Sequence, residues 1–279
     1  MRHFRAPIQE THPPREISPS SALRSFAPSR FISLRSITVY HDPSLTLKLR
    51  RLKSLILTAD DFGRSPTVNA AIERLHRAGL VTQASLMVHE AHVPEAVEIA
   101  RRNPQLRVGL HLTLCSDAPA RAGLRYFFNR SSHPVLKAAI HAQFARFRSL
   151  GLPPTYWDGH LHLHLHPTVL RLTLPIAAEF GVRQTRLVRE PGPPALLPWI
   201  FARLSRAAAP ALTARGIRFT DHVFGLRDTG RITTPVVARL LENLPDGTSE
   251  LYSHPGTEPA DLDPVPLHEI LVRRGIVVG

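Results

Sequence analysis

The chain has 279 residues, 43% of them hydrophobic, and a formal net charge of +13. This length permits one large domain or two small ones, and the single cysteine, Cys115, excludes an internal disulfide and any cysteine-rich zinc module. The basic balance favours an anionic substrate, nucleic acid or an anionic membrane surface as partner, although a soluble enzyme with a basic surface is the simpler interpretation. No stretch approaches the roughly 20 apolar residues that a spanning helix needs.

Residues 1–50 differ from the rest in being rich in Ser, Pro and Arg and in lacking any sustained periodicity. This composition predicts a disordered extension, and it is also typical of an organelle transit peptide. A true start codon near residue 50 is a third interpretation. We expect residues 51–279 to form a single domain.

From Lys53 onward, strand and helix patterns alternate to the end of the chain. Apolar runs predict strands at 54–59, 83–88, 107–114, 155–165, 183–188, 217–224 and 248–253. Helical periodicity predicts helices at 66–78 (between the cap Ser65 and Gly79), 92–102, 134–150, 167–180, 196–215, 233–243 and 265–274, with a loop at 115–132. The alternation predicts a mostly parallel α/β sheet covered by helices, either open or closed into a barrel. Polar residues at several strand ends favour the barrel.

Two adjacent carboxylates, Asp60 and Asp61, follow the first buried strand. Each disfavours the charge of the other, and a bound cation or a shared proton would offset that cost. A capping residue beside a solvated one is the alternative for such a pair, because Asp is common in turns. The position before Phe62-Gly63 favours a functional site.

Histidines supply the other candidate ligands: His111 in an apolar strand, and a run at positions 160, 162, 164 and 166 that alternates with leucines. In an extended strand these four would share one face, and only one or two could reach a single ion. Two histidines and one carboxylate leave coordination positions open for water and substrate. The spare carboxylate could act as general base, and Asp158 could orient a histidine ligand.

His254, at the end of the last predicted strand, could act as a general acid or be a surface or capping residue. A His-rich tract that binds nickel or zinc without catalysis is an alternative for residues 160–166.

Four motifs resemble the YdjC-like family of carbohydrate deacetylases, in the family's order and from about residue 53 to the C-terminus: TADDFG (58–63), GLHL (109–112), DGHLHLH (158–164) and ELYSHPG (250–256). The resemblance implies a distorted TIM-like (β/α) barrel of the glycoside hydrolase/deacetylase type. It implies a divalent metal, Mg or Zn, held by Asp61, His111 and His160. It also implies Asp60 as the base and His254 as the acid in hydrolysis of an N-acetyl group from an amino sugar.

Further stretches resemble the hopanoid-biosynthesis branch of the family: residues 158–167, RLVREP (186–191) and HVFGL (222–226). That resemblance implies an N-acetylglucosaminyl hopanoid lipid as substrate. We therefore expect an amino-sugar or glycolipid substrate, peripheral membrane contact, a cytoplasmic location at the inner membrane face, and a homodimer as one arrangement.

Other functions fit less well. Amidohydrolases of another substrate, and a chitooligosaccharide deacetylase, are the enzymatic alternatives. An amidohydrolase would usually need a bridging lysine or aspartate and late histidines, and Lys137 lies in a predicted helix. A two-His-one-carboxylate iron oxygenase generally sits on an all-β jelly roll. A basic nucleic-acid-binding protein lacks support from an aromatic-rich strand motif, so we expect no specific nucleic acid partner.

Overall fold

The computed structural model describes residues 52–115, 118–153, 155–259 and 262–279. The extension predicted at residues 1–50 lies outside the described residues, so its disorder and the domain boundary beside it stay predictions. The described residues form one compact unit.

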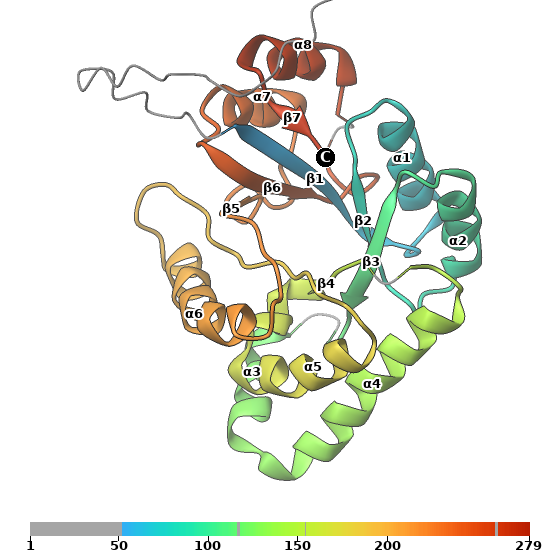
Figure 1. Cartoon of the computed structure of the whole chain (residues 1–279), viewed down its shortest axis with the longest axis vertical. Helices are drawn as coiled ribbons and strands as arrows, with labels where there is room; N and C mark the ends of the chain where they lie inside the picture. The colour runs from blue at the N-terminus through green and yellow to red at the C-terminus, as the bar shows by residue number, and fades with distance from the viewer. Residues whose placement is uncertain (1–51, 116–117, 154, 260–261) are drawn as a thin grey trace, which may run out of the picture. The chain divides into compact units, whose positions relative to one another are not determined.

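A parallel sheet is the centre of the fold (Figure 1). Its strands lie in the order β4-β3-β2-β1-β6-β5, and every pairing is parallel. Their bounds are β1 (Lys53–Phe62), β2 (Gln83–Leu86), β3 (Arg107–Leu112), β4 (Trp157–Gly159), β5 (His222–Phe224) and β6 (Gly247–Ser253). A short β7 (Val277–Val278) pairs with the start of β1. The parallel order puts the carboxyl ends of the strands at one edge, where barrel enzymes place their sites.

The two edge strands of this sheet are brought toward each other by isolated backbone bridges. Trp157 of β4 pairs with Thr185, and Gln184 pairs with Arg218 just before β5. Single bridges take the place of full strands on this side, which makes the barrel distorted. The α/β barrel-type fold expected from the sequence is therefore confirmed.

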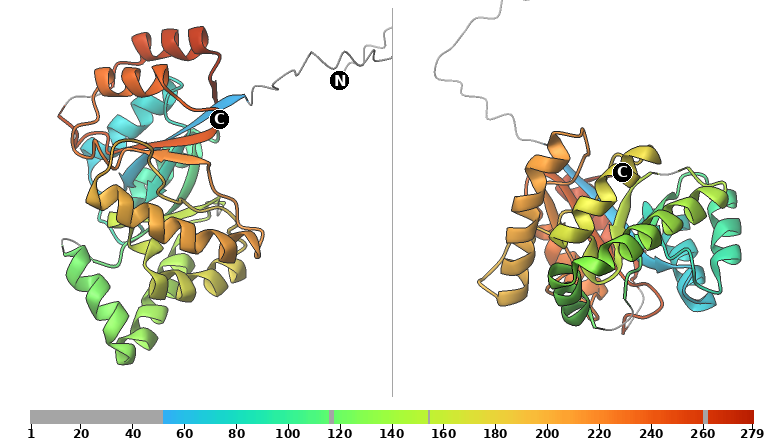
Figure 2. Two further views of the ribbon diagram at one scale, coloured as in Figure 1. Left: turned by 90° about the vertical axis from the view of Figure 1, so that its left-hand side faces the viewer. Right: turned by 90° about the horizontal axis from the view of Figure 1, so that it is seen from below.

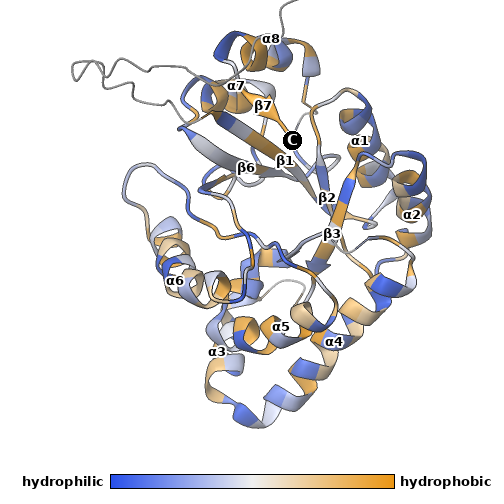
Figure 3. Ribbon diagram, in the orientation of Figure 1, coloured by the Kyte–Doolittle hydropathy of each residue, from blue (hydrophilic) through white to orange (hydrophobic). Residues whose placement is uncertain are grey.

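Helices surround the curved sheet, with α1 and α2 on one side, α4 and α5 on another, and α7 and α8 beyond β1 (Figures 1 and 2). Their bounds are α1 (Pro66–Arg77), α2 (Val93–Arg102), α3 (Pro119–Phe128), α4 (His133–Ser149), α5 (Pro167–Glu179), α6 (Leu196–Thr213), α7 (Thr234–Glu242) and α8 (Pro264–Arg274). Hydrophobic residues predominate along β3 and α5, which face the core (Figure 3). The predicted cap is confirmed, because Ser65 Oγ accepts a hydrogen bond from Val68 N at 3.2 Å.

Three predicted elements were wrong. The loop predicted at 115–132 contains α3, whose Pro119 occupies a first-turn position that tolerates proline. The strand predicted at 155–165 ends at Gly159, because Leu161 and His162 adopt positive φ angles of 55° and 56° that end the extended strand. The strand predicted at 183–188 is reduced to the isolated bridges.

The turn after His254 packs against the first residues of α1. Gly256 has φ +80°, and a Cβ atom there would lie 2.9 Å from Thr67 O and 3.0 Å from Val68 Cα. Gly230 has a similar φ of +74° with open space around it. Both glycines thus have a positive φ angle, which disfavours any other residue, but only Gly256 lacks room for a Cβ atom.

We expect Gly256→Ala to lower the free energy of unfolding by about 1–3 kcal/mol more than Gly230→Ala, because only the first forces backbone apart. Urea denaturation of both variants measures the difference. Equal losses would mean that the turn after His254 can move away from α1 at no cost.

Candidate metal and catalytic site

Asp60 and Asp61 both reach the cleft because β1 is irregular at its end. The register of β1 against β2 shifts between Ala59 and Phe62, and Asp61 has φ 64°. Aspartate tolerates this left-handed conformation better than most residues. A regular strand would send two neighbours to opposite faces, so the bulge accounts for the paired carboxylates.

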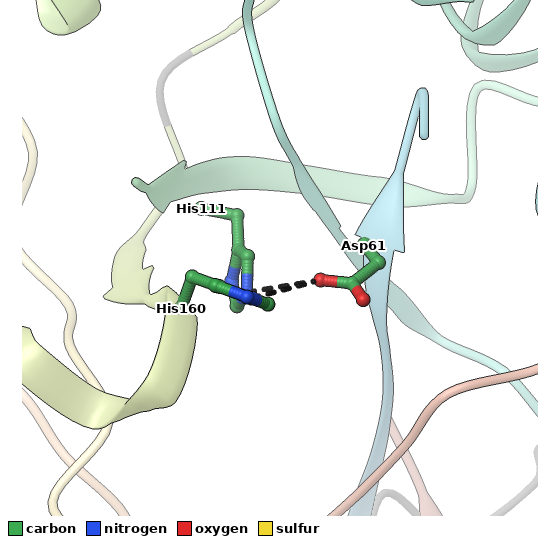
Figure 4. A group of neighbouring side chains, drawn as sticks. All are labelled: Asp61, His111 and His160. Carbon is green, nitrogen blue, oxygen red and sulfur yellow. Dashed lines mark ion pairs between the residues drawn. The ribbon is translucent and has the colours of Figure 1, made fainter. Parts of the chain in front are cut away.

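The structure brings Asp61, His111 and His160 together, as expected from the sequence (Figure 4). Asp61 Oδ1 lies 3.4 Å from His111 Nε2 and 3.2 Å from His160 Nδ1. Asp61 comes from β1 and His111 from β3, and His160 directly follows β4. Three segments that are distant in sequence therefore direct one oxygen and two nitrogens at a common point.

These three side chains fit a divalent cation. Asp61 Oδ1 is buried without a hydrogen-bond partner, whereas Oδ2 accepts from Arg64 Nη1 at 2.6 Å. The free oxygen faces the two imidazole nitrogens, and one carboxylate with two imidazoles is a donor set that suits zinc and related ions.

His111 is fixed in the orientation that a metal ligand needs. Its Nδ1 donates to Asp158 Oδ1 at 2.7 Å, which leaves Nε2 facing Asp61. Burial alone would lower the pKa of His111, but Asp158, Asp60 and Asp61 raise it to about 10. The negative field that attracts a proton to this ring would also attract a cation.

Arg186 forms the other half of the site and is 1% exposed. Its Nη1 and Nη2 donate to the two oxygens of Asp60 at 2.7 and 2.8 Å. Nη2 also lies 2.9 Å from Asp158 Oδ2, and Nε donates to Glu250 Oε1 at 2.8 Å. One buried guanidinium therefore forms ion pairs with three carboxylates from three strands.

The pair with Arg186 decides the state of Asp60. Burial would raise the pKa of Asp60, but the charge and hydrogen bonds of Arg186 outweigh burial and hold it well below its usual range. Burial raises the pKa of Glu250 despite the same guanidinium. Asp60 is therefore a permanently ionised carboxylate beside the proposed metal position.

The formal charges support a divalent ion. Four carboxylates meet here, while the guanidinium groups of Arg186 and Arg64 supply two positive charges. With Glu250 ionised and with His111 and His160 neutral, as metal-ligating histidines are, two formal negative charges remain, and buried charges in proteins are normally compensated. The four carboxylates belong to Asp60, Asp61, Asp158 and Glu250.

A second group, Asp60 with His111 and Asp158, also has potential ligand atoms within 4.8 Å of one another. Arg186 already occupies both oxygens of Asp60 and one of Asp158, and the other oxygen of Asp158 accepts from His111. A cation there would compete with a buried guanidinium, so the group around Asp61 is the better cation site.

Asp60, His111, His160 and His254 line one cavity of about 500 Å³. His254 lies beside Glu258, with Nδ1 3.5 Å from Oε1. Burial would lower the pKa of His254, but Glu258, Asp60 and Asp61 raise it above its ordinary value. The raised pKa favours the protonated form of His254 at the wall of the cavity.

The other three histidines of the run do not share a face, contrary to the expectation for an extended strand. His162 Nε2 shares a 2.9 Å hydrogen bond with the Tyr252 hydroxyl, and burial holds the pKa of His162 well below its usual value. His164 Nε2 donates to Arg186 O at 3.0 Å, and burial lowers its pKa to about 4. His166 caps α5 by accepting from Thr168 N.

Arg186, Glu250 and Tyr252 were not expected from the sequence to have roles in the site. Glu250, Tyr252 and His254 alternate along the end of β6, a period that places them on one side, and that signal could have revealed them. Arg186 lies where no regular strand forms, so periodicity could not find it.

Comparison with known proteins identifies the family. Residues 54–271 match the family described as YdjC-like protein. A carbohydrate deacetylase from Brevibacillus brevis is 33% identical over an alignment 216 residues long, and the alignment covers 72% of this chain and 80% of that protein. A chitooligosaccharide deacetylase from Proteus mirabilis is 31% identical over an alignment 150 residues long, and the alignment covers 48% of this chain and 58% of that protein.

A solved structure of a putative cellobiose-phosphate cleavage protein from Enterococcus faecalis has the same fold, with a TM-score of 0.57 and 22% identity. The match covers 82% of this chain and 97% of that one. Since the family match spans residues 54–271 and a 33% identical relative covers 72% of this chain, the chain belongs to the YdjC-like protein family.

Proposed function

We propose that this protein is a metal-dependent deacetylase that hydrolyses the N-acetyl group of an amino sugar. The observation that carries the proposal is the unpartnered Oδ1 of Asp61 facing His111 and His160 at the wall of a cavity that also holds Asp60. The names of the relatives, carbohydrate deacetylase and chitooligosaccharide deacetylase, support this reaction class.

Asp61, His111 and His160 would hold the divalent ion, and the imidazole nitrogens favour zinc over magnesium. Such an ion would polarise an acetyl carbonyl and acidify a water molecule. Asp60 would be the proton acceptor, and Arg186 keeps its carboxylate in one orientation.

His254 is the group positioned to give a proton to the leaving nitrogen, because it lines the cavity and its pKa is raised. Overall, a C–O bond forms between water and the acetyl carbon while the C–N bond breaks. The products are acetate and the free amine of the sugar. Asp60 and His254 thus have the roles of proton acceptor and proton donor.

An amidohydrolase and an iron oxygenase are both disfavoured. Lys137 is exposed on α4 and does not line the cavity, so it cannot bridge metals there as an amidohydrolase lysine would. The parallel sheet also disfavours an iron oxygenase of the jelly-roll type. The homodimer and the cytoplasmic location stay predictions from the sequence.

We further propose that the amino sugar is attached to an apolar lipid, with an N-acetylglucosaminyl hopanoid as the specific candidate. One wall of the cavity consists of aliphatic and aromatic side chains, which would contact an apolar aglycone and not a second sugar. They are Leu161, Leu197, Ile200, Phe201, Leu204 and Leu226.

Replacing the two neighbouring aspartates separates their roles. We expect Asp60→Asn to keep the metal and lose acetate release about 10²–10⁴-fold, because the proton acceptor is gone. Asp61→Asn should lose both metal and activity. Metal content after dialysis and acetate release from an N-acetylglucosamine substrate measure the two effects.

Asp246→Asn, an exposed aspartate outside the cavity, is the matched control and should behave as wild type. Full activity of Asp60→Asn, or loss of metal from it, would contradict the division of roles. Acetate release that is unaffected by removal of the metal would contradict metal dependence.

The lipid assignment predicts a substrate preference. The N-acetylglucosaminyl hopanoid in mixed micelles should have at least about a tenfold higher kcat/KM than diacetylchitobiose, because the apolar wall contributes only to the first. Leu204→Ser should reduce the glycolipid value and leave the disaccharide value nearly unchanged. A preference for diacetylchitobiose would instead support a chitooligosaccharide deacetylase.

Arg186 should also govern stability. Arg186→Met leaves three buried carboxylates without their counter-charge, and we expect the free energy of unfolding to fall by about 3–5 kcal/mol. Arg183→Met, an exposed arginine nearby, should change it by less than about 0.5 kcal/mol. Similar values for both variants would show that Arg186 is dispensable to the fold.

A further inference from the structure

The start of α6 carries an exposed apolar segment. Residues 191–202 read PGPPALLPWIFA and contain no charged side chain. Leu196 is 75% exposed and Trp199 is 56% exposed, with Leu197 and Ile200 beside them. Monomeric proteins rarely expose large apolar side chains in such a continuous group, and a group of this kind marks an interaction surface.

A second exposed apolar group lies on α3, across the same cavity. Leu124, Phe127 and Phe128 are all exposed, and the Phe127 ring lies 5.9 Å from the ring of His166, which lines the cavity. Residues of both α3 and α6 line that cavity. The exposed residues of α3 and α6 therefore form an apolar rim beside the opening: Leu124, Phe127, Phe128, Leu196, Leu197, Trp199 and Ile200.

The surroundings of the apolar rim are positively charged. The described residues from 118 to 157 and from 191 to 220 contain no Asp or Glu. Arginines flank the rim, and the guanidinium of Arg203 lies 5.2 Å from the centre of the Trp199 ring. Those on α3, on α6 and between α3 and α4 are Arg121, Arg125, Arg130, Arg203 and Arg206. The hydropathy colouring of α6 alternates between hydrophobic and hydrophilic residues (Figure 3).

We propose that the apolar rim docks the protein on the surface of an anionic lipid bilayer. Tryptophan and leucine side chains enter the interface between headgroups and acyl chains, while neighbouring arginines contact anionic headgroups. Among the described residues no helix is long and apolar enough to cross a membrane, so the contact is peripheral. Docking places the opening of the cavity at the lipid surface.

Charge complementarity distinguishes a bilayer from a second copy of the chain. Two apolar rims facing each other would bring the flanking arginines of both copies together, and neither α3 nor α6 carries an acidic residue to offset them, which is unfavourable. An anionic lipid surface satisfies both the apolar and the cationic part. The delivery of a lipid-linked amino sugar to the cavity rests on the proposed function, whereas the docking does not.

The two tryptophans make the docking measurable in the full chain. Trp157 is fully buried, so a fluorescence change on adding vesicles reports on Trp199. With phosphatidylcholine vesicles containing phosphatidylglycerol, we expect a blue shift and quenching by brominated acyl chains. Pure phosphatidylcholine vesicles should bind more weakly. Absence of quenching with anionic vesicles would overturn the proposal.

Variants locate the binding surface by vesicle flotation. Leu196→Ser/Trp199→Ser should weaken binding at least about tenfold, because two large apolar side chains no longer enter the lipid. Val265→Ser/Val272→Ser removes two exposed valines from α8 and should bind as wild type. Circular dichroism and the thermal midpoint verify that both variants fold.

Three outcomes would contradict the docking surface. Unchanged flotation of Leu196→Ser/Trp199→Ser would place the binding elsewhere on the chain. A dimer in solution that dissociates on this substitution would show that a second copy of the chain covers the apolar rim. Vesicle binding that requires an added protein would show that this protein, and not lipid, covers the apolar rim. None of these measurements uses substrate, so the deacetylase proposal stands or falls separately.

Discussion

Arg186 comes from the segment after α5 and binds carboxylates on three different strands: Asp60 on β1, Asp158 on β4 and Glu250 on β6. Its burial is costly unless every donor is used, and the three carboxylates would repel one another without it. Asp158, held by Arg186, in turn orients His111 by accepting a hydrogen bond from its Nδ1. The orientation of the candidate ligand His111 therefore depends on Arg186, although Arg186 pairs with Asp60, Asp158 and Glu250 and with none of the three expected ligands.

The bulge at the end of β1 gives two neighbouring aspartates different environments. Asp60 faces a guanidinium that occupies both of its oxygens, whereas Asp61 keeps one buried oxygen free beside two imidazoles. Like charges so close would raise one pKa if nothing else intervened. Here Arg186 lowers the pKa of Asp60, and His111 and His160 lower the pKa of Asp61. Asp61 can therefore bind a cation while Asp60 serves as the proton acceptor.

Alternating strand and helix patterns were enough to predict the fold class, because buried parallel strands and amphipathic helices each have a clear period. The motifs at strand ends also indicated Asp60, Asp61, His111, His160 and His254. The run after β4 was mispredicted because Leu161 and His162 adopt left-handed angles that side-chain alternation does not reveal. Arg186 was missed because its segment has neither strand pairing nor periodicity, and only tertiary contacts define its role.

Anomalous X-ray diffraction from zinc-loaded crystals tests the central claim, the division of labour between the two aspartates, most directly. The account predicts one ion bonded to Asp61 Oδ1, His111 Nε2 and His160 Nδ1, with Asp60 still paired to Arg186. An ion bonded to Asp60, or placed between Asp60, His111 and Asp158 with Arg186 displaced, would contradict it.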